Sequence, residues 1–240
     1  MHTYPYFLIL LLLTFTTAAD VKAVVHRLET KYRSARTLKA TFLERYTENG
    51  RVVRVEAGIA YFRRPGKMRW EYEAPEKNLF LVDGKTAWFY VPADHTATRV
   101  PAKMSTDWRT PLALLAGEMK VSSVCARVRS ATNEKVESPD NVMLHCELRG
   151  AGNKSKEANA SEAPTAGGEA GEAIFFEIVN ETGELVSVAV RDPGGVGIEF
   201  HFSNWQVDPP VDDSLFHFRA PPGVAIVNGE LPGSLAGVNP

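Results

Sequence analysis

Bulky apolar and polar side chains alternate through the stretch Gly58–Pro92, and the rest of the chain can be arranged around this pattern. Side chains on a β-strand point to opposite faces with a period of two. Ala60, Phe62 and Arg64 therefore share one face of the first run. Turn residues divide the stretch into four such runs, so it predicts four consecutive strands of an antiparallel sheet.

Two later runs of this stretch differ in how much of the strand is apolar. Residues 67–73 place Met68 and Trp70 on one face and charged side chains on the other, which is typical of a sheet with one dry face and one wet face. Residues 87–91 are apolar on both faces, and Phe89 lies on one of them. We therefore expect the strand at 87–91 to be covered on both sides.

Two short turn motifs predict hairpins in which both turn residues have positive φ. They are Asn49-Gly50 and Asp83-Gly84, the residue pairs that type I′ turns favour. Further strands are predicted at residues 37–47, 51–64, 95–101, 173–180, 184–191 and 196–207. The many aromatic residues and closely spaced turn signals agree with a mainly β chain.

Two helices are predicted. In the first, Asp20 is placed to cap an amphipathic run whose apolar residues follow helical spacing: Val21, Val24, Val25, Leu28 and Tyr32. The second is short and nearly all apolar, with Thr110 as N-cap, Pro111 at its first position and Gly117 just past its end. A helix of this kind has to lie on an apolar surface, either as ordinary core packing or as a lid over a cavity mouth.

The two cysteines, Cys125 and Cys146, lie in strand-like runs on either side of a polar stretch near Lys135. If the runs form an antiparallel hairpin with its turn there, the two residues face each other and an exported chain could oxidise them. A structural disulfide and a buried pair of free thiols are the two alternatives. A metal site is not expected, because His145 is the only further ligand nearby.

The ends of the chain and one internal segment differ from the rest in composition. Residues 1–19 lack Lys, Arg, Asp and Glu and contain a short apolar core before a small-residue cleavage site, which predicts a secretory signal. Residues 20–227 are long enough for one domain with a single core. The polar segment 151–172 predicts a flexible insertion, and the Gly- and Pro-rich residues 228–240 predict a disordered tail.

Charge and motifs exclude several classes of function. The formal net charge of −2 does not suit a nucleic-acid binder. The histidines show no metal-ligand spacing, and there is no nucleophile elbow or phosphate loop, so we expect neither an enzyme nor a cofactor. Asp212-Asp213 is interpreted as a cap for a short turn, and His201 is expected to point outward into solvent.

The apolar face of the predicted sheet mixes small and large residues. Gly58 and Ala60 lie beside Phe62, and Met68 lies beside Trp70. Such a face would leave room for a ligand, since a packed barrel interior needs bulk at each layer. A closed and solid core is the alternative that the sequence leaves open.

Several motifs in a fixed order carry a resemblance to a known family. They are Leu38–Phe42, Arg63–Trp70, Leu81–Thr86 followed by Trp88–Pro92, Thr110–Leu112, and Phe216–Val224. In this order the motifs resemble the LolA family of periplasmic lipoprotein carriers over most of residues 20–227. Met68 departs from the family pattern, in which an aromatic residue is common at that position.

The resemblance implies a fold, mainly β with short helices (α+β): an unclosed antiparallel β-barrel, or half-barrel, covered by an α-helical lid. The first helix would be part of the lid, and a plug that only stabilises one end of the sheet is the alternative. The acyl-binding cavity would be lined by Phe42, Ala60, Phe62, Met68, Trp70, Phe89, Leu112 and Leu115. Arg64 would gate the lid by bonding helix carbonyls, with a surface ion pair to Glu56 or Glu71 as the alternative.

The implied function is that of a monomeric periplasmic carrier that shuttles lipoproteins from the inner to the outer membrane. Its partners would be the acyl chains of lipoproteins, an inner-membrane lipoprotein-releasing ABC transporter and an outer-membrane lipoprotein receptor. Two other functions remain open for the same fold. One is a carrier of another lipid or glycolipid working with an inner-membrane exporter, and the other is a lipid-sensing regulator.

Overall fold

The computed structural model describes residues 20–104, 112–117, 120–148, 173–229 and 231. The predicted signal at 1–19, the insertion at 151–172 and the capping residues Thr110 and Pro111 lie outside these residues. The helices are α1 (Val21–Arg33), α2 (Ala113–Ala116) and α3 (Val121–Val124), with 3-10 turns η1 (Pro92–Asp94), η2 (Ala102–Met104) and η5 (Asp213–Phe216). The strands are β1 (Thr37–Glu48), β2 (Arg51–Arg63), β3 (Lys67–Ala74), β4 (Leu79–Asp83), β5 (Thr86–Val91), β6 (Thr96–Pro101), β7 (Cys125–Ser130), β8 (Asn141–Leu148), β9 (Ala173–Val179), β10 (Leu185–Arg191), β11 (Val196–Val207) and β12 (Ala225–Asn228).

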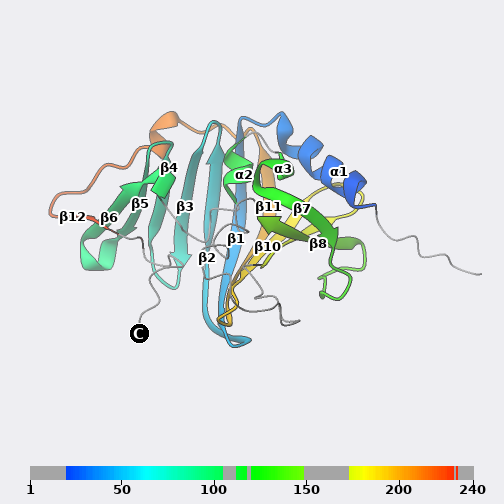
Figure 1. Cartoon of the computed structure of the whole chain (residues 1–240). Coiled ribbons are helices and arrows are strands. Elements are labelled where there is room, and N and C mark those ends of the chain that lie inside the picture. The colour runs from blue at the N-terminus through cyan, green and yellow to red at the C-terminus, as the bar shows by residue number, and fades with distance from the viewer. Residues whose placement is uncertain (1–19, 105–111, 118–119, 149–172, 230, 232–240) are drawn as a thin grey trace, which may run out of the picture.

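All strands belong to one curved sheet, in the order β12-β6-β5-β4-β3-β2-β1-β11-β10-β9-β8-β7. Neighbours are antiparallel, except that β12 pairs parallel to β6. The two end strands, β12 and β7, do not pair with each other in this order, so the barrel is unclosed. Figure 1 shows α1, α2 and α3 gathered near one end of the strands. This confirms the expected mainly β half-barrel with short helices.

The strand register separates the sheet into two faces. One cross-strand row runs through Ala40, Ala60, Trp70, Phe80 and Phe89, and it is buried except at Phe89, which is partly buried. We call the face that carries this row the inner face. The neighbouring residues on each strand point to the opposite, outer face, as the alternation predicted.

The outer face is also covered where the sequence required it. Phe218 follows η5 and packs its ring on Trp88 and Tyr90 of β5, with ring centroids 4.8 and 5.7 Å apart. Phe216 of η5 is fully buried, and Arg63 lies over its ring. The C-terminal segment thus covers the outer side of β5, which agrees with the apolar residues on both faces of this strand.

One of the two predicted hairpin turns has a different geometry. Asn49 and Gly50 both have positive φ, as a type I′ turn requires. In the second hairpin Gly84 has positive φ, whereas Asp83 ends β4 and is not among the residues with positive φ. The Asp83 carboxylate instead accepts hydrogen bonds from the backbone N–H groups of Lys85 and Thr86. The Asp side chain thus organises this turn in place of an Asp backbone with positive φ.

Three boundaries also differ from the expectations. The run before Cys125 was predicted to be strand-like, but Val121–Val124 forms a helical turn, α3, before β7 begins. Helix α2 begins after Leu112, later than expected, whereas its end at Ala116, with Gly117 just past it, is as expected. Near the C-terminus, the expectation of a disordered tail from residue 228 onward is also not met at two residues. Asn228 is the last residue of β12, which pairs with β6, and Leu231 is buried in the core.

Candidate functional site

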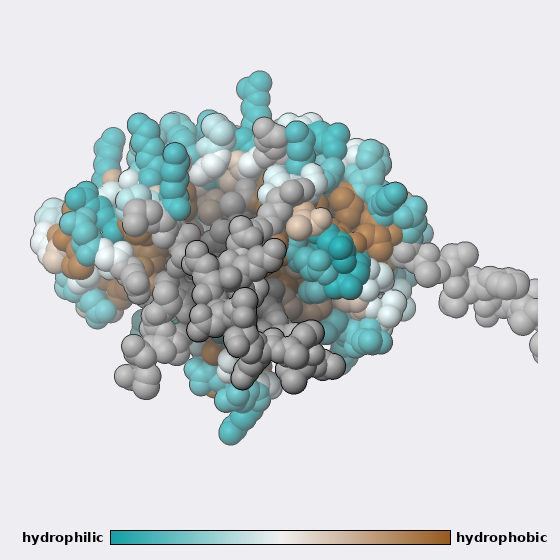
Figure 2. All heavy atoms as spheres, viewed as in Figure 1, coloured by the Kyte–Doolittle hydropathy of each residue, from teal (hydrophilic) through white to brown (hydrophobic). Residues whose placement is uncertain are grey.

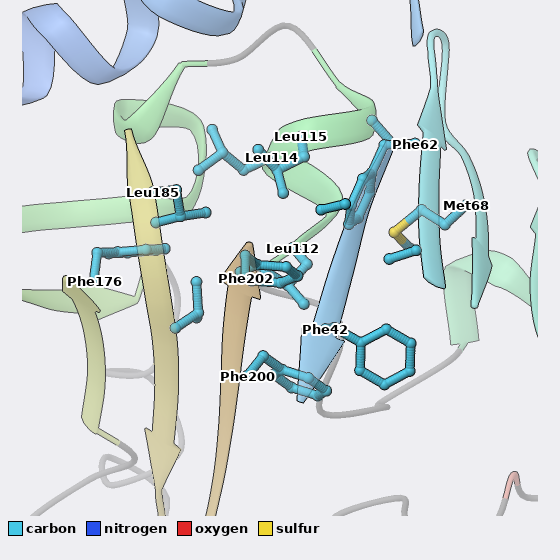
Figure 3. Close-up of a cluster of buried hydrophobic side chains, with 14 of the residues drawn as sticks. Phe42, Phe62, Met68, Leu112, Leu114, Leu115, Phe176, Leu185, Phe200 and Phe202 are labelled. Carbon is cyan, nitrogen blue, oxygen red and sulfur yellow. The ribbon is translucent and has the colours of Figure 1, made fainter. Parts of the chain in front are cut away.

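The predicted cavity residues lie together in one hydrophobic cluster on the inner face. Phe89 packs against the cluster as a partly buried residue. The other seven predicted residues are buried members of it: Phe42, Ala60, Phe62, Met68, Trp70, Leu112 and Leu115. Figure 3 shows the leucines of α2 above side chains from strands on both halves of the sheet. Alternation within each strand was enough to predict which of these side chains share the face.

Aromatic rings on neighbouring strands form the centre of this cluster. The Trp70 ring lies 4.7 Å from Phe42, 5.6 Å from Phe62 and 5.2 Å from Phe200, measured between centroids. Phe200 and Phe202, both on β11, were not singled out from the sequence. The alternation within residues 196–207 could have suggested them, but their position beside Trp70 depends on the pairing of β1 with β11, in which Phe202 lies opposite Phe42.

Around Trp70, the described side chains of the inner face pack closely against one another. Ala40 and Ala60 are small, but both are fully buried, and the large ring of Trp70 lies in their cross-strand row with 0% exposure. Leu112 and Leu115 of the α2 segment are each 1% exposed. The α2 segment therefore covers part of this apolar surface.

The α2 segment is held mainly by apolar side chains. Leu112, Leu114 and Leu115 are buried in the cluster, and α2 contacts β2, β3 and α3. One backbone hydrogen bond joins it to the β2–β3 turn, from the N–H of Gly66 to the carbonyl of Ala116, at 2.8 Å. A four-residue helix is not stable alone, so its structure depends on this apolar contact.

Arg64 connects the end of β2 to the C-terminal end of α1. Its Nη1 donates to the carbonyls of Arg33 and Ala35 at 2.5 and 2.7 Å, and its Nη2 donates to the carbonyl of Tyr32 at 2.9 Å. Carbonyls at a helix C-terminus carry partial negative charge, so a guanidinium is a suitable partner. Burial lowers the pKa of Arg64 from its ordinary value, while the charge of Asp208 acts to raise it.

The alternative partners suggested for Arg64 are engaged elsewhere. Glu56 forms an ion pair with Arg54 at 3.0 Å, and Glu71 forms one with Arg69 at 2.6 Å. Arg64 therefore donates hydrogen bonds to carbonyls at the end of α1 and does not form the alternative ion pair with Glu56 or Glu71.

Helix α1 is also fixed by its own side chains. Tyr32 is fully buried, and its hydroxyl accepts a hydrogen bond from the N–H of Leu185 at 3.1 Å. Burial raises the pKa of the Tyr32 phenol, so the hydroxyl stays protonated. Glu29 accepts from the N–H of Val121 at 2.8 Å and so caps α3. These polar contacts attach α1 to β10 and α3 in addition to its buried apolar side chains, whereas α2 is held mainly by apolar contacts.

Cys125 and Cys146 form a disulfide with their Cα atoms 5.4 Å apart. They do not face each other directly, because Cys125 pairs with Leu148 and Cys146 pairs with Val128. The register also shifts between Cys125 and Arg127, so the disulfide joins two residues that are offset along the hairpin. The disulfide joins the start of β7, next to α3, to β8.

A groove of about 330 Å³ lies between α1 and the α3–β7 segment, beside this disulfide. Val21 and Val25 line one wall, and Val121 and Val128 line the other. Figure 2 shows hydrophobic side chains on the right of the molecule, the side on which α1 lies in Figure 1. The groove thus has valines on both walls, and its lining also includes the charged residues Lys22, Glu29 and Arg127.

The inner face also carries a buried polar pair that the sequence analysis missed. Glu44 is 2% exposed, and its carboxylate accepts a hydrogen bond of 2.7 Å from the hydroxyl of Tyr72, which is itself buried. The signal was present in the sequence, since Glu44 follows Phe42 at an alternate position of β1. A charged residue at an inward position is uncommon and usually has a specific role.

On the outer face, one expectation is wrong and another is confirmed. The His201 side chain is only 13% exposed, and its ring nitrogens lie 2.9 Å from Glu137 and 3.1 Å from Glu199. It was expected to be solvated, but Glu199 on its own strand β11 and Glu137 in the segment before β8 supply carboxylates that enclose it. Asp212 caps η5 as expected, because its carboxylate accepts from the N–H of Ser214 at 2.8 Å.

Two properties of the described residues bear on the class of protein. They contain no group of three or more His, Cys, Asp or Glu side chains arranged to hold a metal ion. Within the same residues, every helix is too short or too polar to cross a membrane.

The fold and the covered apolar face define a half-barrel protein in which helices close over a surface suited to apolar ligands. Residues 33–138 match the family model described as outer membrane lipoprotein carrier protein LolA. A protein of Chromobacterium violaceum named outer-membrane lipoprotein carrier protein is 30% identical over 216 residues, covering 89% of this chain and 92% of that protein. A protein of the same name from Methylococcus capsulatus is 28% identical over 230 residues, covering 94% and 98%.

These similarities show that the chain belongs to the LolA family. A solved structure of an uncharacterised conserved protein from Thermus thermophilus has the same fold, with a TM-score of 0.50 and 13% identity, over 87% of this chain and 98% of that chain.

Proposed function

We propose that the protein is a periplasmic carrier that binds the acyl chains of lipoproteins on its inner face and shuttles them from the inner membrane to the outer membrane. The observation that supports this most directly is the burial of Leu112, Leu114 and Leu115 against the aromatic inner face. A short helix that fills an apolar surface can be exchanged for another apolar body of similar size.

The α2 segment and an acyl chain gain similar free energy by burying apolar groups on the inner face, which suits a reversible carrier. Burying one leucine side chain is worth about 1.5–3 kcal/mol, and burying one methylene about 0.8 kcal/mol. Three leucines are therefore equivalent to roughly 6 to 11 methylenes, which is less than one long acyl chain. An acyl chain can displace α2 without becoming so tightly bound that it is never released.

Arg64 stabilises the closed state and so opposes the displacement of α2 by cargo. Its three hydrogen bonds, to two carbonyls at the end of α1 and to that of Ala35 just beyond it, form next to Gly66, whose N–H holds α2. Charge-assisted hydrogen bonds are stronger than neutral ones. In this proposal, cargo opens the helical cover, and the recovery of the Arg64 bonds helps to expel cargo at the acceptor membrane.

The proposed partners follow from the two ends of this route. An inner-membrane lipoprotein-releasing ABC transporter would load the carrier, and an outer-membrane lipoprotein receptor would receive the cargo. Two curated relatives carry the name outer-membrane lipoprotein carrier protein over nearly their whole length, which supports the same route for this chain.

The proposal can be tested by isolating the protein from the periplasm of a producing cell and identifying bound molecules by mass spectrometry. We expect acylated lipopeptide or whole lipoprotein. A second step would incubate the loaded protein with isolated outer membranes and measure transfer of the lipoprotein. Recovery of free lipid or glycolipid without any lipopeptide, and failure to accept lipoprotein, would contradict the proposal and favour a carrier of another lipid.

A further inference from the structure

The indole N–H of Trp70 is a buried hydrogen-bond donor with no partner in the part of the chain that the structure describes. Trp70 has 0% exposure, so water does not reach the nitrogen. The second tryptophan packed against this cluster behaves differently, because the Trp205 indole donates to the carbonyl of Leu185 at 2.8 Å. Buried indole N–H groups normally find such a partner. An orphan donor at Trp70 therefore requires an explanation.

Packing alone does not require an indole at this position. Trp70 is surrounded by phenylalanine rings at Phe42, Phe62 and Phe200, with centroids 4.7 to 5.6 Å away. A wholly apolar side chain would satisfy these neighbours without burying a donor, whose loss of hydration is unfavourable. Trp70 lies on the inner face, the surface on which the proposed function places the cargo.

A second polar group lies close to Trp70 on the same face. Tyr72 is two residues further along β3, and its hydroxyl donates to Glu44. The Phe42 ring touches both aromatic residues, with centroids 4.7 Å from Trp70 and 5.1 Å from Tyr72. The inner face is therefore apolar along most of its length but has a polar region around Trp70, Tyr72 and Glu44.

We infer that the Trp70 N–H donates to the carbonyl oxygen of the ester through which an acyl chain of the cargo is attached. An ester carbonyl is the hydrogen-bond acceptor that lies at the head of an acyl chain, whereas the hydrocarbon beyond it offers none. This inference rests on the proposed function and refines it: the inner face would recognise esterified acyl chains, and it would discriminate against the corresponding ether lipid, in which the carbonyl is replaced by a methylene.

The test compares a matched pair of lipids, dioctanoylglycerol and the diether dioctylglycerol, as competitors for bis-ANS bound to the full-length mature protein. We expect the ester lipid to displace the dye with an affinity about five- to tenfold higher than the ether lipid, the ratio given by one neutral hydrogen bond. Equal affinities for the two lipids would overturn the inference but leave the proposed function standing. If neither lipid displaced the dye, both would fail.

Two variants separate the donor from the ring. Trp70→Phe keeps an aromatic side chain and removes the N–H, so the ester-to-ether ratio should fall to about one while both lipids still bind. Trp88→Phe makes the same change on the outer face and should keep the wild-type ratio. A Trp70→Phe protein that retained the wild-type ratio would contradict the inference. If Trp70→Phe failed to fold, the ratio measured on the wild-type protein would decide.

Discussion

The guanidinium of Arg64 donates to the main-chain oxygen of Tyr32 at 2.9 Å, so the end of β2 is attached directly to the last turn of α1. The other terminal nitrogen of Arg64 reaches the carbonyls of Arg33 and Ala35. A single side chain thus satisfies three backbone acceptors at a helix end that would otherwise need water or a cap. The link joins the sheet to the helical cover, and its loss should be felt in the balance between closed and open states.

Replacing Arg64 by leucine should therefore give a protein that binds cargo but does not pass it on. The closed state would lose about 1–3 kcal/mol of charge-assisted hydrogen bonding, which shifts the balance towards the loaded state by roughly 5- to 150-fold. Transfer of a lipoprotein from the purified variant to isolated outer membranes would measure this.

The matched control is Arg63→Leu. Arg63 lies on the outer face, 3.7 Å from Asp213, and makes no part of the link to α1 described above. Its replacement removes the same charge and should leave transfer near the wild-type rate. Normal transfer by Arg64→Leu would rule out the gating role.

Truncating a leucine of the α2 segment should weaken the closed state and strengthen cargo binding. Leu115 is 1% exposed, so Leu115→Ala should lower the free energy of unfolding of the empty protein by about 2–4 kcal/mol. The same change removes a competitor for the inner face, so an acyl probe should bind more tightly. Chemical denaturation and a fluorescence titration with a fatty-acyl probe would measure the two effects.

Leu81→Ala provides the comparison for that experiment. Leu81 is also fully buried, but it pairs across the sheet with Arg69 and Trp88 in an outer-face row. Its truncation should cost similar stability without any gain in affinity for the probe. Equal effects of the two truncations on binding would show that α2 does not compete with cargo.

Local alternation was sufficient to predict much of the fold. The placement of Ala60 and Phe62 on one face needed only the period of a strand, and Asp20 was recognisable as a cap from its residue type. The partners of Arg64 were expected only from the family resemblance. Nothing local to Arg64 indicates that the carbonyls of residues 32 to 35 lie within its reach.

The features that were missed depend on contacts between distant strands. The filling of the inner face around Trp70 involves Phe200 and Phe202, which reach it through the pairing of β1 with β11. Cys125 and Cys146 are offset because the β7–β8 hairpin pairs Cys125 with Leu148, and an irregularity in β7 adds to this offset; the sequence alone does not fix that register. His201 was expected in solvent because its own strand alternates, but Glu137 comes from another segment.

Removing the disulfide should destabilise the protein substantially. Cys125 and Cys146 are 21 residues apart, and closing a loop of this length is worth about 3 kcal/mol in the chain-entropy model. The double variant Cys125→Ser, Cys146→Ser should therefore unfold at lower denaturant concentration, since its unfolded chain is less constrained. Urea unfolding with and without a reductant would measure this. Reductant should destabilise the wild-type protein and leave the double variant unchanged, and an unaffected wild-type protein would contradict the assignment.

Acid should weaken the charge cluster on the outer face through Glu199. Its hydrogen bond to His201 lowers the pKa of the Glu199 carboxyl from its ordinary value, although burial acts in the opposite direction; the charge of Arg45, 3.3 Å away, also lowers it. A carboxyl group whose pKa is lower in the folded protein stabilises the fold above its ordinary pKa, and this contribution is lost as the pH falls through the folded value.

Between about pH 4.5 and the lower folded pKa of Glu199, the wild-type free energy of unfolding should therefore decrease with falling pH. The contribution should be below about 1 kcal/mol, because the Glu199 side chain is partly exposed and screened by solvent. Glu199→Gln should make the dependence shallower in this range, as measured by urea unfolding at a series of pH values. Glu73→Gln, an exposed residue of β3, controls for the change in net charge. If Glu199→Gln followed the same pH profile as the wild-type protein, the carboxylate would not be coupled to stability through His201 and Arg45.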